Sequence, residues 1–162
     1  MRNGTKIAYI AMAFAGGIGL LYSCKKTDNT PAAPEIALLE VNPRTVIAAN
    51  PADTVYIRLS FKDKNGDVGI GGNSSDYDMF LIDSRDKTEV GYRIPKLPTQ
   101  TNENKPGLQG TIILAVEAAF LNLRQDSIHL EADTLTWDLY IKDLAGHVSN
   151  TITTPQVILK AK

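Results

Sequence analysis

Two stretches of this chain alternate strictly between apolar and polar side chains, and this alternation restricts the fold more than any other feature. In residues 54–61 the apolar positions are Val55, Ile57, Leu59 and Phe61. In residues 134–142 they are Leu135, Trp137, Leu139 and Ile141. Because a strand points successive side chains to opposite faces, both stretches predict strands with one buried face. Trp137 shares the phase of its apolar neighbours, so we expect it to pack in the core.

Weaker strand patterns recur along the rest of the chain. They cover residues 36–41, 77–82, 89–94, 111–116 and 151–159. With the two strong stretches they predict an all-β domain, an antiparallel β-sandwich of about seven strands and of the immunoglobulin or fibronectin type III kind. Residues 116–125 are the one place where a helical turn between strands is expected. Pro155 predicts that the last segment lies at a sheet edge or on a bulge.

The N-terminus has the pattern of a secretory signal. Arg2 and Lys6 precede an uncharged apolar run from Ile7 to Leu21, which is shorter than a bilayer-spanning helix needs. The run ends at Leu21-Tyr22-Ser23-Cys24, and Cys24 is the only cysteine of the 162 residues. This tetrapeptide resembles the lipobox of bacterial lipoproteins, which implies cleavage after Ser23 and lipidation of Cys24. Two or three acyl chains would then anchor the protein firmly in a membrane.

These features divide the chain into three parts. Residues 1–23 are the expected lipoprotein signal peptide, residues 24–35 the lipidated cysteine with a flexible tether, and residues 36–162 the β-sandwich domain. Removing Arg2 and Lys6 from the 17 basic residues leaves 15 against 18 acidic ones, a net charge near −3. Such a balance provides no basic surface for nucleic acid. With a single cysteine, neither an internal disulfide nor a cysteine-based metal site can form.

A short acidic loop follows the first strong strand. Its sequence is Asp63-Lys64-Asn65-Gly66-Asp67-Val68-Gly69, and Asp63, Asn65 and Asp67 can offer three oxygens to a hard cation. Ca²⁺ takes six to eight oxygens, so Asp76 and Asp78 would have to add ligands across the glycine-rich stretch 70–75. The alternative is a tight turn in which Gly66 takes a positive φ and the aspartates bond to their own backbone. The sequence leaves both interpretations open.

A second acidic turn lies between the Trp137 strand and the last strand. Asp143 and Gly146 belong to Asp143-Leu144-Ala145-Gly146-His147-Val148-Ser149-Asn150, and both residues suit a chain reversal. Together with FKDKNGDVGIGG at 61–72, YRIPKLP at 92–98 and GTIILAV at 110–116, this turn resembles small Bacteroidetes lipoproteins with an immunoglobulin-like domain. In that pattern the turn usually reads Asp-x-Ala-Gly-Asn, and His147 replaces the asparagine. The resemblance implies a location in the cell envelope, at the outer membrane, facing the periplasm or the cell surface.

The sequence contains no recognisable catalytic motif. His147 lies near Ser149, and His129 near Asp126 and Ser127, but neither serine lies in a nucleophile-elbow context. Carboxylate pairs such as Glu131 and Asp133 are interpreted as solvated surface charge. We therefore expect a non-catalytic, lipid-anchored module that binds a protein or glycan partner. The alternatives are a structural accessory subunit of an envelope complex with a Ca²⁺-stiffened loop, or a carbohydrate-active or ester hydrolase.

Overall fold

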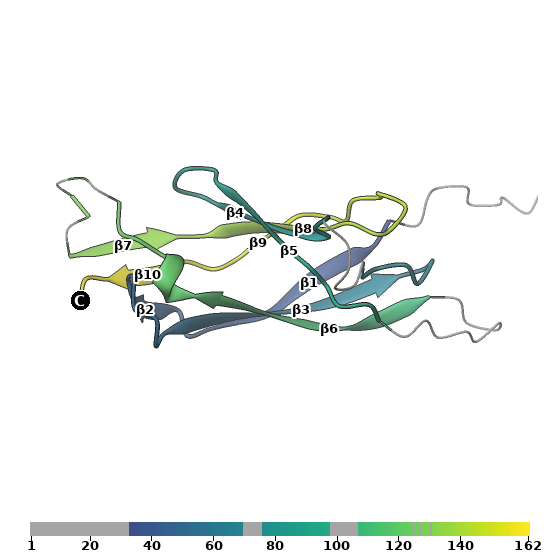
Figure 1. Ribbon diagram of the computed structural model, residues 1–162, viewed down its shortest axis with the longest axis horizontal. Helices are drawn as coiled ribbons and strands as arrows, with labels where there is room; N and C mark the ends of the chain where they lie inside the picture. Colours follow the sequence, from purple (N-terminus) through teal and green to yellow (C-terminus); the bar gives the residue numbers. More distant parts are fainter. Residues whose placement is uncertain (1–32, 70–75, 98–106, 125, 127, 130) are drawn as a thin grey trace, which may run out of the picture. The chain divides into compact units, whose positions relative to one another are not determined.

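The computed structural model describes residues 33–69, 76–97, 107–124, 126, 128–129 and 131–162, and within these ranges the chain is all β (Figure 1). Its ten strands are β1 (Glu35–Asn42), β2 (Thr45–Ile47), β3 (Thr54–Asp63), β4 (Met79–Asp83), β5 (Glu89–Tyr92), β6 (Leu108–Glu117), β7 (Ala132–Leu135), β8 (Trp137–Ile141), β9 (Ile152–Thr153) and β10 (Val157–Lys160). One turn of 3₁₀-helix, η1 (Ala118–Phe120), follows β6. The described residues contain no helix that is long and apolar enough to cross a membrane.

The strands form three sheets. The first has the order β1-β3-β6 and the second the order β5-β4-β8-β9, and all neighbours in both are antiparallel. The third has the order β2-β10-β7, in which β2 runs parallel and β7 antiparallel to β10. Long-range pairing therefore brings together strands from the beginning and the end of the chain.

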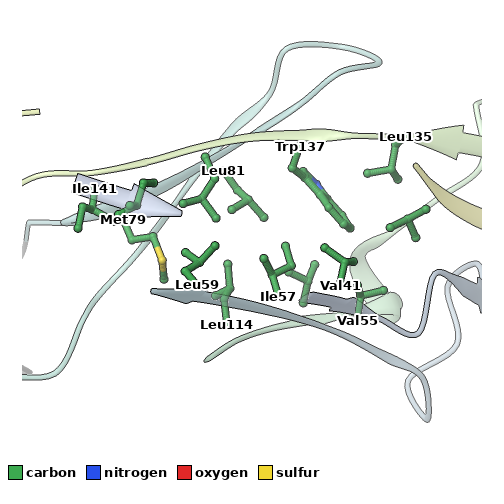
Figure 2. Packing of buried hydrophobic residues seen from close by; sticks show 14 of the residues in the cluster. Val41, Val55, Ile57, Leu59, Met79, Leu81, Leu114, Leu135, Trp137 and Ile141 are labelled. Carbon is green, nitrogen blue, oxygen red and sulfur yellow. The ribbon is translucent and has the colours of Figure 1, made fainter. Parts of the chain in front are cut away.

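The alternating stretches supply the core. Val55, Ile57 and Leu59 of β3 are fully buried, and Trp137 and Leu139 of β8 are 3% and 0% exposed. Side chains of β3 and β6 face those of β4 and β8 across this core (Figure 2). The prediction that Trp137 is a core residue is confirmed. Its indole points from β8 toward the facing sheet (Figure 2).

The strand that we expected over residues 134–142 is divided in two at Thr136. The N–H of Thr136 bonds to the Ser84 hydroxyl at 3.0 Å, and its carbonyl accepts from the Ser84 N–H at 3.0 Å. Thr136 therefore leaves the ladder, and β7 pairs with β10 whereas β8 pairs with β4. The alternation of buried side chains continues across the break, which is why the sequence did not reveal it.

Residues 151–159 are likewise divided, into β9 and β10 on either side of Pro155. Proline has no N–H to donate to a ladder, so the chain leaves the sheet of β8 there and joins that of β7. Thr154 stabilises this change from one sheet to the other, because its hydroxyl accepts a hydrogen bond from the Trp137 N–H at 2.9 Å. The expected helical turn within 116–125 is present as η1. The short strand β2 was not predicted.

Candidate functional site

The two acidic turns that the sequence shows as separate features lie side by side. The carboxylates of Asp63, Asp67 and Asp143 each offer an oxygen, and these oxygens all lie within 4.8 Å of one another. Two contacts join the turns: Val68 pairs with Asp143 as an isolated β-bridge, and the Leu144 N–H bonds to the Asp67 carbonyl at 3.1 Å. We call these three carboxylates the acidic centre.

The first turn is organised by Asp63 at the end of β3. Its buried carboxylate accepts backbone N–H bonds from Asn65 at 3.2 Å, Asp67 at 2.7 Å and Val68 at 3.1 Å. Gly66 has a φ of +72°, the left-handed conformation that the turn interpretation required. The same Asp63 thus shapes the turn and belongs to the acidic centre, so the two interpretations of this loop are compatible.

The second turn is organised by Asp143 in a similar way. Its Oδ1 accepts from the His147 N–H at 2.8 Å, and its carbonyl accepts from the Gly146 N–H at 3.0 Å. Gly146 has a φ of +86°. The His147 imidazole lies against the other carboxylate oxygen, with Nδ1 2.7 Å from Oδ2. His147 therefore fixes the orientation of the Asp143 carboxylate, as residues around metal ligands commonly do.

Asp67 is the member of the acidic centre whose charge is least compensated. Its Oδ1 is buried and has no hydrogen-bond partner among the described residues. Burial raises the pKa of the Asp67 carboxyl, and the nearby charges of Asp143 and Asp63 raise it further. A divalent cation would supply the missing partner and neutralise the repulsion. The acidic centre can therefore bind a metal such as Ca²⁺.

The other residues expected to bind metal are not part of the acidic centre. Asn65 is exposed, and its backbone N–H caps Asp63. Asp78 is fully buried, and its Oδ1 accepts from the Ile94 N–H at 2.6 Å. Asp76 is exposed at the start of the segment that leads into β4. The glycine-rich stretch 70–75, across which these aspartates were expected to fold back, lies outside the described residues, as do the leader and Cys24.

The chain has two histidines, His147 and His129, and each lies near a serine in the sequence. The Ser149 hydroxyl accepts from the Ile141 N–H at 3.0 Å and donates to the Asn150 carbonyl at 2.8 Å, so its proton is not directed at His147. Ser127, the serine beside His129, lies outside the described residues.

In the other histidine, His129, both ring nitrogens are engaged. Nδ1 lies 2.6 Å from Asp126, and Nε2 lies 2.6 Å from Nη2 of Arg124. Because a guanidinium can only donate, Nε2 is the acceptor and the proton is on Nδ1. Neither nitrogen is left to act as a base.

The burial of Asp133 differs from what the sequence led us to expect. It was interpreted as solvated surface charge together with Glu131, but it is 2% exposed, whereas Glu131 is exposed. Its carboxylate accepts from Arg85 Nη1 at 3.1 Å and from Arg124 Nη2 at 2.8 Å. The interpretation was wrong because Asp133 is in phase with Leu135 and so points inward from β7. The sequence contained this information, because Asp133 lies two residues before Leu135 and so has its side chain on the same face of the strand.

The outward aromatic residues of β4 and β8 contact each other. Phe80 and Tyr140 stack with ring centroids 4.9 Å apart, and the Lys142 ammonium lies 4.5 Å from the Phe80 ring. The Tyr140 hydroxyl donates to Glu89 at 2.9 Å. These contacts therefore stabilise the outer face of the sheet that contains β4 and β8.

The fold and the acidic centre together define a β-sheet domain with a candidate cation site between two loops. No protein-family model, curated protein or solved structure matches the chain. Its function is therefore inferred from the geometry.

Proposed function

We propose that this chain is a non-catalytic, lipid-anchored binding module of the cell envelope, with an immunoglobulin-like β-sandwich whose loops at the acidic centre are held by Ca²⁺. The main evidence for Ca²⁺ binding is the Oδ1 of Asp67, which is buried without a hydrogen-bond partner among the described residues and lies beside the carboxylates of Asp63 and Asp143. Leaving such an oxygen buried without a partner costs the protein stability. A bound cation removes that cost.

The ligand set favours a hard cation. Three carboxylates provide three oxygens and three negative charges, and Ca²⁺ accepts water and backbone carbonyls as its further ligands. The hydrogen bonds of Asp63 and Asp143 to their own turns hold two of the carboxylates in place before the ion arrives. Ca²⁺ would link the turn after β3 to the turn after β8 and so stiffen both.

The anchoring part rests on the leader and on Cys24. The acylated cysteine would attach the domain to the outer membrane, and residues 24–35 would serve as its tether. The sandwich assignment is supported by the buried faces of β3 and β8, which pack against each other across one core. A binding role is favoured over catalysis because the Ser149 hydroxyl donates to the Asn150 carbonyl and both ring nitrogens of His129 are engaged.

The metal part is tested by thermal unfolding of the full chain. In millimolar Ca²⁺ we expect a higher melting temperature than in chelator, since ligand at 100 times its Kd adds about 2.7 kcal/mol of stability. Magnesium at the same concentration is the matched control, because Mg²⁺ gives up its waters reluctantly and demands a stricter geometry. Equal melting temperatures in Ca²⁺ and in chelator would exclude the proposed ion.

The anchoring part is tested by metabolic labelling with a clickable fatty acid. The parent chain should be labelled and recovered with membranes, whereas Cys24→Ala should be unlabelled and released. An unlabelled parent that retains Met1 would refute the envelope assignment. Affinity isolation of the lipidated parent from native envelopes, with Cys24→Ala as the control, would then identify the protein or glycan partner.

A further inference from the structure

A cavity of about 680 Å³ opens on the side of the domain where two edge strands lie. One wall is formed by β4, β5 and the turn that joins them, and the other by the end of β6, η1 and the residues up to Arg124. Within the described residues, β5 and β6 each end their sheet. Trp137 of β8 also lines the cavity.

The cavity walls are mainly apolar. Leu81 and Leu121 are buried, while Val90 and Phe120 are 46% and 78% exposed. Exposed apolar side chains around an apolar cavity are typical of a site that receives a ligand, and small-molecule sites usually have volumes of about 300–1,000 Å³. The volume therefore suits a single small molecule.

Two polar groups among the lining residues remain available as donors. The hydrogen bonds of Trp137 in the described structure involve only its backbone, so the indole N–H has no partner there. The Tyr92 hydroxyl likewise makes no hydrogen bond to the described residues, and burial raises the pKa of this phenol, which keeps its proton in place. A ligand with a carbonyl or ether oxygen could accept from either group.

The charges around the cavity disfavour an anion. Arg85 and Arg124 are the cations among the lining residues, and both guanidiniums are bonded to carboxylates, Arg85 to Asp83 and Asp133 and Arg124 to Asp133. Asp86 and Glu117 are exposed acids on the lining, and no salt bridge is found for either within the described residues. Among the lining residues, a carboxylate or sulfonate would therefore meet two unpaired acids, whereas both guanidiniums already bind carboxylates.

We propose that this cavity binds a neutral, mainly apolar small molecule with a hydrogen-bond acceptor, held by the apolar walls and by the donors of Trp137 and Tyr92. The inference is independent of the acidic centre and of the lipid anchor, because none of its residues belongs to either. It adds a ligand class to the binding module without depending on Ca²⁺.

The experiment uses the full chain and the neutral dye 6-propionyl-2-dimethylaminonaphthalene, which carries a carbonyl and absorbs where tryptophan emits. Trp137 is the only tryptophan, so energy transfer from it reports dye bound near the cavity. We expect saturable transfer with one dye per chain. The anionic dye 1-anilinonaphthalene-8-sulfonate should bind at least tenfold more weakly.

Three variants locate the dye. Phe120→Ala should weaken binding by about three- to tenfold, which corresponds to the loss of an aromatic contact. Tyr92→Phe, which keeps the ring and removes the hydroxyl, should weaken it by a similar factor. The matched control is Ile113→Ala, because Ile113 is also an exposed apolar residue, 60% exposed on β6, but does not line the cavity.

Unchanged binding in Ile113→Ala together with weaker binding in the two cavity variants would support the proposal. Absence of energy transfer, tighter binding of the anionic dye, or equal effects of Ile113→Ala and Phe120→Ala would overturn it. If Tyr92→Phe fails to fold, Val90→Lys replaces it, since Val90 is half exposed and a lysine there should weaken dye binding by about tenfold or more.

Discussion

Arg85 donates from Nη1 to the buried carboxylate of Asp133 at 3.1 Å, although 48 residues separate them in the chain. The contact ties the turn between β4 and β5 to β7. Arg124 binds the same carboxylate from the loop after η1, and its backbone N–H donates to it as well, at 3.1 Å. One buried acid therefore joins three segments that belong to no common sheet.

Asp133→Asn should be strongly destabilising. The substitution leaves Arg85 and Arg124 without their shared counter-charge, and breaking a buried ion pair in this way costs roughly 3 kcal/mol. Equilibrium unfolding in urea would measure the loss. Glu40→Gln is the control, because among the described residues Glu40 forms a salt bridge only with Arg58, both side chains are 51% exposed, and breaking such a surface pair should change stability far less. Equal losses in the two variants would contradict the role assigned to Asp133.

The same network predicts a loss of stability in acid. Burial alone would raise the pKa of Asp133, but hydrogen bonds from Arg124 and Arg85 outweigh it and hold the pKa well below its usual range. Since the folded pKa is below the unfolded one of about 3.9, the stabilisation is present above that pH and is lost as the pH falls below it. Thermal unfolding between pH 7 and pH 2 should show a steeper acid loss in the parent than in Asp133→Asn.

Asp67→Asn should separate the charge repulsion of the acidic centre from its ability to bind metal. In chelator the variant should be at least as stable as the parent, because the substitution removes a partly buried negative charge whose pKa is raised by burial and by the charges of Asp143 and Asp63. In millimolar Ca²⁺ only the parent should gain stability. Glu131→Gln, at an exposed acid outside the centre, should keep the full response to Ca²⁺. A calcium response that persists in Asp67→Asn would place the ion elsewhere.

Two glycines with positive φ provide a matched comparison of backbone strain. Gly69 has a φ of +102°, and a Cβ there would lie 2.8 Å from the Pro95 carbonyl oxygen. Gly146 has a φ of +86°, but a Cβ there would meet nothing within 4 Å. Gly146→Ala should therefore cost only the conformational penalty of about 1–2 kcal/mol, and Gly69→Ala clearly more. Urea unfolding of both variants tests this, and a smaller loss at Gly69 would contradict the close approach to Pro95.

The strands could be predicted because their signal is local. The positions of Val55 to Phe61 are read from neighbouring residues, and every inward position predicted there is buried. The division of the sheets could not be predicted in the same way. It depends on the hydrogen bond between Ser84 and Thr136 and on the pairing of β10 with β7. Neither contact changes the alternation of apolar and polar residues along the chain.

The sequence predicts part of the acidic centre, because only the contacts within each turn are local. The spacing of Asp63 and Asp67 within one turn is visible in the sequence, and so is the suitability of Asp143 for a turn. What joins them is the bridge between Val68 and Asp143, a contact between distant segments that local spacing does not encode. The sequence therefore suggested Asp76 and Asp78 as further ligands, whereas the third carboxylate of the centre comes from the other turn.

The position of β10 has a consequence for when this domain can form. β10 is the last strand along the chain, yet it lies in the middle of its sheet, between β2 and β7. Without Val157–Lys160, β2 and β7 have no common neighbour, and Leu159, which is fully buried in the folded chain, cannot cover its part of the core. β2 and β7 both pair with β10 and not with each other, so a chain that stops before Val157 leaves each of them without its partner in this sheet.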